Sequence, residues 1–178
     1  MNTLPLRIGL LVVLYVCFGV SLFASASMLP ERVATHFDGA GVANGWMIRS
    51  THLMCMSVFG LVFPNFLIGI CWSIRFVPAG LVNIPHREYW LADERRSETA
   101  SYLVWHAVWF ACLALGFVIG LHWLVVLSNQ RQPPQLPIAW VLGVVGPFLV
   151  GVAVWVICLV RHFRIAEPGG GTMPPVRG

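Results

Sequence analysis

The sequence predicts an all-α integral membrane protein, in which four spanning helices form one compact bundle. Hydrophobic residues make up 58% of the 178 residues and charged residues only 10%, whereas soluble domains carry about 25% charged residues. With so little polar surface, the chain cannot cover a domain that is exposed to water. The lipid bilayer is therefore an expected partner. Nucleic acid is not, because the arginines are spread between the apolar runs rather than gathered in a basic patch.

The first expected span covers residues 8–27, which form an uncharged run long enough to cross a bilayer as a helix. A competing interpretation is a secretory signal peptide, because Arg7 precedes the run and Ala24-Ser25-Ala26 resembles a cleavage site. The apolar run is long for a signal peptide. We therefore expect a retained helix, and cleavage stays open as the alternative.

Three further apolar runs predict spans at residues 53–76, 102–127 and 137–160. The second contains Pro64-Asn65, which predicts a kink and an amide that faces another helix. Gly116 and Gly120 in the third permit a close helix approach. These spans and their loops form one transmembrane domain, residues 1–164, and the Gly- and Pro-rich residues 165–178 are expected to be a disordered tail.

The arginines predict the orientation of the bundle. With the N-terminus inside, eight arginines fall on the inner side and three on the outer side. The outer three are Arg32, Arg49 and Arg131. Such a bias in short loops is typical of cytoplasmic positive charge. We therefore expect both termini in the cytoplasm and a structured outer loop between the first two helices.

The expected outer loop and the adjoining helix ends contain the candidate metal ligands. His36 and Asp38 lie in the loop, and His52 and His122 lie near the outer ends of the second and third spans. Imidazole and carboxylate together suit zinc, imidazole also suits copper, and the pair His52 and His122 could ligate haem. The competing interpretation needs no metal, because these side chains can hydrogen-bond at the interface and brace the loop. We favour that interpretation and predict no cofactor.

Two segments resemble one known family. The outer segment reads LPERVATHFDGAGVANGW, and the inner loop contains NIPHREYWLADERR. Both resemble the domain-of-unknown-function family 1648, the module of SdpI-like bacterial immunity proteins, over residues 8–127. The matching outer residues are Pro30, His36, Phe37, Gly41 and Trp46, with Asp38 where the family more often has Asn. The matching inner residues are Asn83, Pro85, Tyr89 and Trp90.

The resemblance implies a multi-pass protein of the bacterial inner membrane. In the best-known members it also implies protection against a peptide toxin, or signalling. The chain contains no H-E-x-x-H, P-loop or G-x-S-x-G motif, and we expect no enzymatic activity. The leading expectation is a peptide or protein partner bound by the outer loop, through the six outer residues named above. The alternatives are an accessory subunit of a respiratory, photosynthetic or metal-dependent oxidase complex and, more weakly, a metal-handling protein. The oligomeric state stays open.

Overall fold

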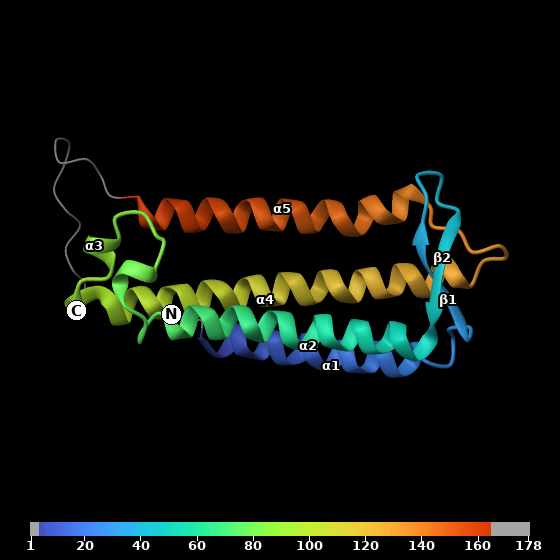
Figure 1. The fold of residues 1–178 in the computed structure, drawn as a ribbon, viewed down its shortest axis with the longest axis horizontal. Coiled ribbons are helices and arrows are strands. Elements are labelled where there is room, and N and C mark those ends of the chain that lie inside the picture. The colour runs from blue at the N-terminus through green and yellow to red at the C-terminus, as the bar shows by residue number, and fades with distance from the viewer. Residues whose placement is uncertain (1–3, 165–178) are drawn as a thin grey trace.

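The computed structural model describes residues 4–164 and consists of four long helices with a β-hairpin across one end (Figure 1). The long helices are α1 (Leu4–Ser25), α2 (Arg49–Ser73), α4 (Asp93–Asn129) and α5 (Ile138–Phe163). Each of them is long and apolar enough to cross a membrane. The prediction of four spanning helices in a multi-pass protein is confirmed. The predicted disordered tail lies outside the described residues.

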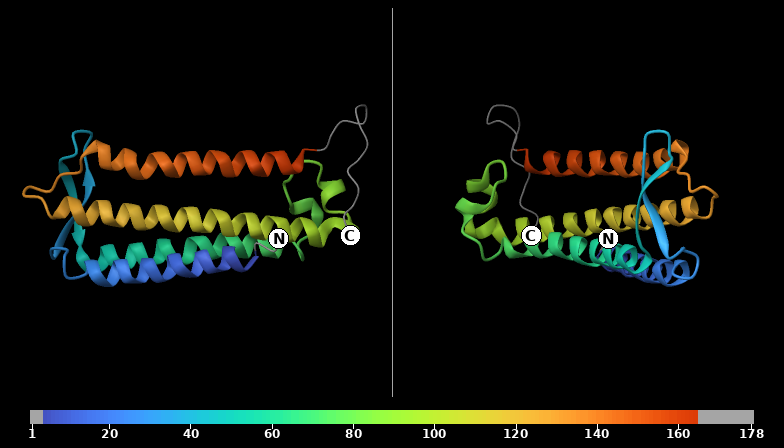
Figure 2. Two further views of the ribbon diagram at one scale, coloured as in Figure 1. Left: turned by 180° about the vertical axis from the view of Figure 1, so that it is seen from behind. Right: turned by 45° about the vertical axis from the view of Figure 1, so that its right-hand side comes forward.

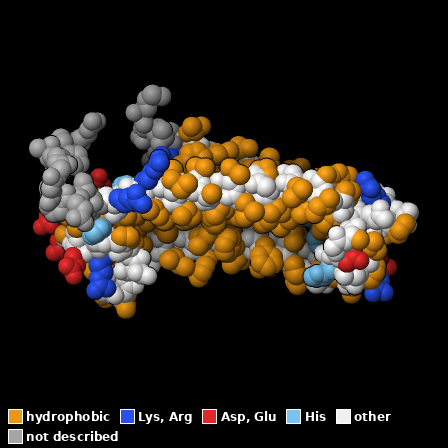
Figure 3. Space-filling view, turned by 90° about the horizontal axis from the view of Figure 1, so that it is seen from above, with side chains coloured by type: hydrophobic (Ala, Val, Ile, Leu, Met, Phe, Trp, Pro, Cys, Tyr) orange, Lys and Arg blue, Asp and Glu red, His pale blue; other side chains and the backbone are white. Residues whose placement is uncertain are grey.

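The end of the molecule opposite the hairpin holds the short elements η1 (Ala79–Leu81) and α3 (Arg87–Trp90). Helix α1 begins, and α5 ends, at this same end (Figure 1). Figure 3 shows hydrophobic side chains along the middle of the molecule, with arginine, acidic and histidine side chains gathered at the two ends. This distribution fits a molecule whose middle lies in hydrocarbon and whose ends meet water.

The helices do not form the compact bundle that the sequence led us to expect. Helix α4 is central, α1 and α2 pack along one side of it, and α5 packs along another side without comparable contact to α1 or α2 (Figures 1 and 2). No residue of α5 before Phe163 is buried. In lipid there is little hydrophobic gain from closing a bundle, because acyl chains are as apolar as leucine. An apolar helix surface can therefore stay open.

Small residues set how closely the neighbouring helices approach. A Cβ on Gly120 would lie 2.8 Å from Val144 Cγ1, and one on Gly151 would lie 2.7 Å from Leu113 Cδ1, so α4 and α5 meet at these glycines. Gly116 has no such neighbour. The Asn65 amide donates to the Tyr15 hydroxyl at 2.9 Å, so it faces α1, as a polar group within a span is expected to do.

Helix α4 begins well before the expected third span. It has 37 residues, which corresponds to about 55 Å at 1.5 Å per residue, whereas the hydrocarbon core is about 30 Å thick. Its first turns carry Asp93 and Glu94. This charged segment is therefore helical and continuous with the span.

The all-α expectation is wrong for the segment between α1 and α2. Strands β1 (Arg32–Phe37) and β2 (Ala43–Ile48) form an antiparallel hairpin, with Arg32 opposite Ile48 and Ala34 opposite Trp46. The register shifts between Ala34 and Phe37. Asp and Gly between two short runs that can form strands are typical of a hairpin.

Candidate functional site

The hairpin turn is held by one carboxylate and one glycine. Asp38 Oδ1 accepts hydrogen bonds from the backbone N–H groups of Ala40 and Val42, both at 2.9 Å. Gly41 has a φ of 77°, in the left-handed region that favours glycine. Asp38 therefore binds backbone groups of the turn, which is the loop-bracing role weighed against metal binding.

The turn also contacts the connection between α4 and α5. Leu136 N donates to Gly41 O at 2.9 Å, and a Cβ at Gly41 would meet the Leu136 carbonyl oxygen. Of the three glycines Gly39, Gly41 and Gly45, only Gly41 has a positive φ. A Cβ at Gly39 would meet no atom within 4 Å. Gly45 lies within β2, where a Cβ would come 2.9 Å from His36 Cβ.

One side chain at the end of α4 fixes β1. Asn129 Oδ1 accepts from Ala34 N at 2.8 Å, and Asn129 Nδ2 donates to Ala34 O at 2.9 Å. The same amide nitrogen donates to Val125 O at 2.8 Å. Asn129 thus occupies the place of a neighbouring strand beside Ala34, which is fully buried. Sequence reasoning missed this residue, because a single Asn at a helix end carries no signal of its distant partner.

A buried polar chain joins α1, α4 and α2 near the hairpin. His122 Nε2 lies 2.7 Å from Ser25 Oγ, and His122 Nδ1 lies 3.2 Å from His52 Nε2. All three side chains are at most 2% exposed. Ser25 Oγ also donates to Leu22 O. We therefore assign protons so that His52 donates to His122 and His122 donates to Ser25, which leaves both imidazoles neutral and satisfies each of these contacts.

The four candidate metal ligands are not brought together. His52 and His122 are in direct contact, with ring centroids 5.3 Å apart and planes inclined by 15°. His36 is exposed on β1, and Asp38 binds the turn. Residues 4–164 contain no group of three or more His, Cys, Asp or Glu side chains placed to hold a metal ion. The two imidazoles named as possible haem ligands hydrogen-bond to each other.

The outward side of β2 presents a row of apolar side chains. Within β2, Trp46 and Ile48 are 49% and 59% exposed, and Asn44 is exposed in the same alternation. Val42, just before the strand, is 44% exposed. Strand β2 has β1 as its one strand neighbour in the described sheet. Just before β2, Val42 forms an isolated antiparallel bridge with Gln135, and beyond this bridge β2 is an edge strand. Of the other expected binding residues, Pro30 is exposed and Phe37 is half-buried.

The inner-loop motif lies at the opposite end of the molecule and serves packing there (Figure 1). Trp90 Nε1 donates to Phe163 O at 3.4 Å, and Thr99 Oγ1 donates to Trp90 O at 2.7 Å. The Tyr89 ring lies 4.1 Å from the Arg95 guanidinium carbon. Trp90 packs on the end of α5, and Leu91 is buried. The remaining motif residues, Asn83 and Pro85, are exposed.

Comparison with known proteins gives one match. Residues 10–61 match the model of a family described as a domain of unknown function, DUF1648. This range contains most of α1, the whole hairpin and the first half of α2. It supports the family resemblance for the outer segment and does not reach the inner-loop motif. No curated protein and no solved structure shows significant similarity to the chain.

Proposed function

We propose that this protein lies in the bacterial cytoplasmic membrane and binds an extended peptide, or an extended segment of a protein, along strand β2 on the outer side. Its role is non-enzymatic, of the SdpI-like immunity or signalling type. The observation that carries the proposal is the edge strand β2 with its exposed apolar row. The family match over the hairpin supports this choice of element.

An edge strand with exposed apolar side chains suits binding by strand addition. In that mode, backbone hydrogen bonds to the open edge give affinity, and alternate side chains give specificity. Trp46 and Ile48 lie two residues apart and are both exposed. They offer apolar contacts to residues at alternate positions of an added strand. The fixed hairpin also lowers the entropic cost of binding, because Asn129 and the turn already order it.

The orientation belongs to the same proposal and has its own test. A cysteine at position 40, in the turn, is expected to react with a membrane-impermeant maleimide added to intact cells. A cysteine at position 94, in the first turn of α4, is expected to react only after the membrane is opened. Both positions are exposed. The unmodified chain, with its five cysteines, is the background control. Labelling of both positions from the same side would contradict the proposed topology.

Peptide binding is tested with a displayed library of random peptides and the purified protein in mild detergent. We expect enriched peptides to alternate apolar and polar residues, and Trp46→Ser to weaken their binding by about tenfold or more, as loss of an aromatic anchor does. Leu81→Ser is the matched control, because Leu81 is 76% exposed at the opposite end of the molecule. Equal binding by the Trp46→Ser variant would refute the proposal. Stoichiometric large subunits in the purified sample, without peptide binding, would favour an accessory subunit.

A further inference from the structure

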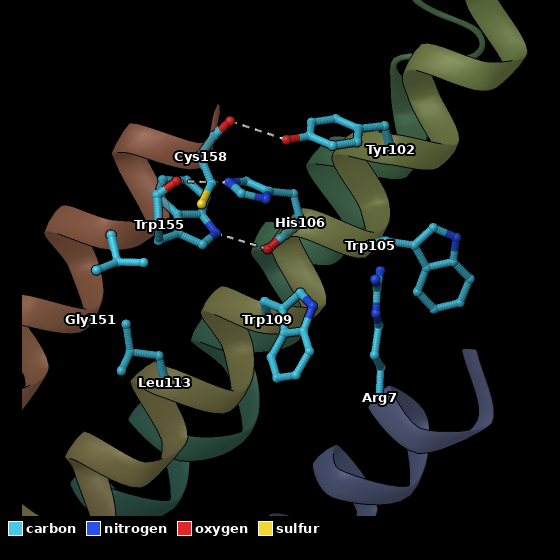
Figure 4. Close-up of a pocket in the computed structure, with 10 residues that line it drawn as sticks. Arg7, Tyr102, Trp105, His106, Trp109, Leu113, Gly151, Trp155 and Cys158 are labelled. Carbon is cyan, nitrogen blue, oxygen red and sulfur yellow. Dashed lines mark hydrogen bonds between the residues drawn. The ribbon is translucent and has the colours of Figure 1, made fainter. Parts of the chain in front are cut away.

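A cleft opens between α1, α4 and α5 in the half of the molecule nearer α3, and the hairpin plays no part in it. Its volume is about 480 Å³, within the range of roughly 300–1,000 Å³ that is typical of ligand sites. The cleft exists because α5 packs on α4 and leaves α1 uncovered on that side. Figure 4 shows Arg7 rising from α1, aromatic side chains on α4, and Trp155 facing them from α5.

The walls of the cleft are apolar, and their polar atoms largely satisfy one another. Trp155 Nε1 donates to His106 O at 2.9 Å, and His106 Nε2 lies 3.0 Å from Trp155 O. The Tyr102 hydroxyl lies 3.5 Å from Cys158 O. These contacts cross from α4 to α5 and fix the aromatic wall (Figure 4). The wall therefore presents an apolar surface to a ligand, and the polar atoms of the wall do not need hydrogen bonds from that ligand.

Arg7 is the charged group among the described residues that line the cleft. None of these described residues is Asp or Glu. Arg7 Nε has no hydrogen-bond partner among the described residues, and the guanidinium carbon lies 5.7 Å from the Trp109 ring centroid. Figure 4 shows the side chain between Trp105 and Trp109. A cation in apolar surroundings is stabilised by an anion that hydrogen-bonds to it.

We propose that this cleft binds one anionic phospholipid of the bilayer, with its phosphate on Arg7 and an acyl chain along Leu113 and Val154. Arg7 lies near the start of α1, and tryptophans beside it are typical of the headgroup level. Leu113 and Gly151 lie further along α4 and α5, toward the middle of the membrane (Figure 4). Val154 is 55% exposed on an apolar helix, so the ligand reaches the cleft from the bilayer. Basic pockets between spanning helices suit acidic headgroups.

Native mass spectrometry with a mixture of phosphatidylglycerol and phosphatidylcholine tests the proposal. We expect one phosphatidylglycerol to be retained per chain, about tenfold in preference to phosphatidylcholine, which corresponds to a charge-assisted contact. Arg7→Gln is expected to abolish the preference. Arg161→Gln is the matched control, because it removes the same charge from an exposed position at the same end of the molecule. Preference retained in Arg7→Gln, or absent in the unmodified chain, would overturn the proposal.

A second pair of variants leaves Arg7 in place and tests the apolar part of the cleft. Val154→Phe fills the wall where the acyl chain would lie, and we expect a severalfold loss of retained phosphatidylglycerol. Val156→Phe makes the same change on α5 outside the cleft lining and is expected to retain the lipid. Equal retention by the two variants would overturn the assigned position. A lipid-free dimer as the main species would overturn the proposal in favour of a second copy of the chain in the cleft.

Discussion

Replacement of Asn129 by leucine is expected to lower the free energy of unfolding by about 3 kcal/mol and to release the hairpin from α4. The substitution nearly preserves the volume but removes both hydrogen bonds to Ala34. Because Ala34 is fully buried, its N–H and C=O groups would remain without a partner, at about 1–3 kcal/mol each. Titration with SDS in detergent micelles measures the stability. Hydrogen exchange measures protection of the amides of residues 32–37.

The neighbouring amide provides a control for the Asn129 prediction. Gln130 Nε2 donates to Met28 O at 2.8 Å in an exposed position, where water replaces the lost partner. Gln130→Leu is therefore expected to change the free energy of unfolding by less than about 1 kcal/mol. If the two leucine variants have the same stability and the same amide protection in β1, Asn129 does not anchor the hairpin.

Replacement of His122 by leucine is expected to lower the free energy of unfolding by about 2–4 kcal/mol, because it removes a hydrogen bond from each of two buried side chains. His52 would lose the partner of its Nε2, and Ser25 would lose the imidazole at 2.7 Å. The same change at His36, which is exposed on β1, is expected to have little effect. Unfolding titrations of both variants measure the difference.

The double variant of His52 and His122 separates pairing from simple packing. If the two imidazoles are hydrogen-bonded partners, His52→Leu combined with His122→Leu costs less than the sum of the two single changes, by about 1 kcal/mol or more. Additive effects would contradict a direct bond between the rings. The outcome also bears on the metal alternative, because a bond between the two imidazoles occupies one nitrogen of each ring.

The spanning helices could be predicted from the sequence because each depends on the composition of its own segment. Arg49 and Asp93 show where this reasoning loses precision. Both begin helices several residues before the apolar run. Hydropathy could not locate these starts, because a charged helical turn outside the hydrocarbon is not apolar. The open position of α5 could not be predicted either. A lipid-facing apolar residue and one that faces another helix look the same in a sequence.

The candidate site could be predicted only in part. His52 and His122 were expected at the same depth, and the structure places their rings in contact. Ser25 and Asn129 were missed as partners, because each meets a residue more than 90 positions away in the chain, and one sequence gives no register between distant helices. The hairpin was missed because glycines in residues 39–45 were interpreted as loop residues rather than as turn and strand positions.

Helix α5 is connected by a hydrogen bond at each of its ends to another part of the molecule. At one end, Leu136 just before the helix is bonded to the hairpin tip at Gly41. At the other end, the Phe163 carbonyl is bonded to the Trp90 indole. Between them, 26 helical residues span about 39 Å with α4 as their main lateral support. A displacement of the hairpin tip is therefore transmitted to the start of α5 through the bond between Gly41 and Leu136.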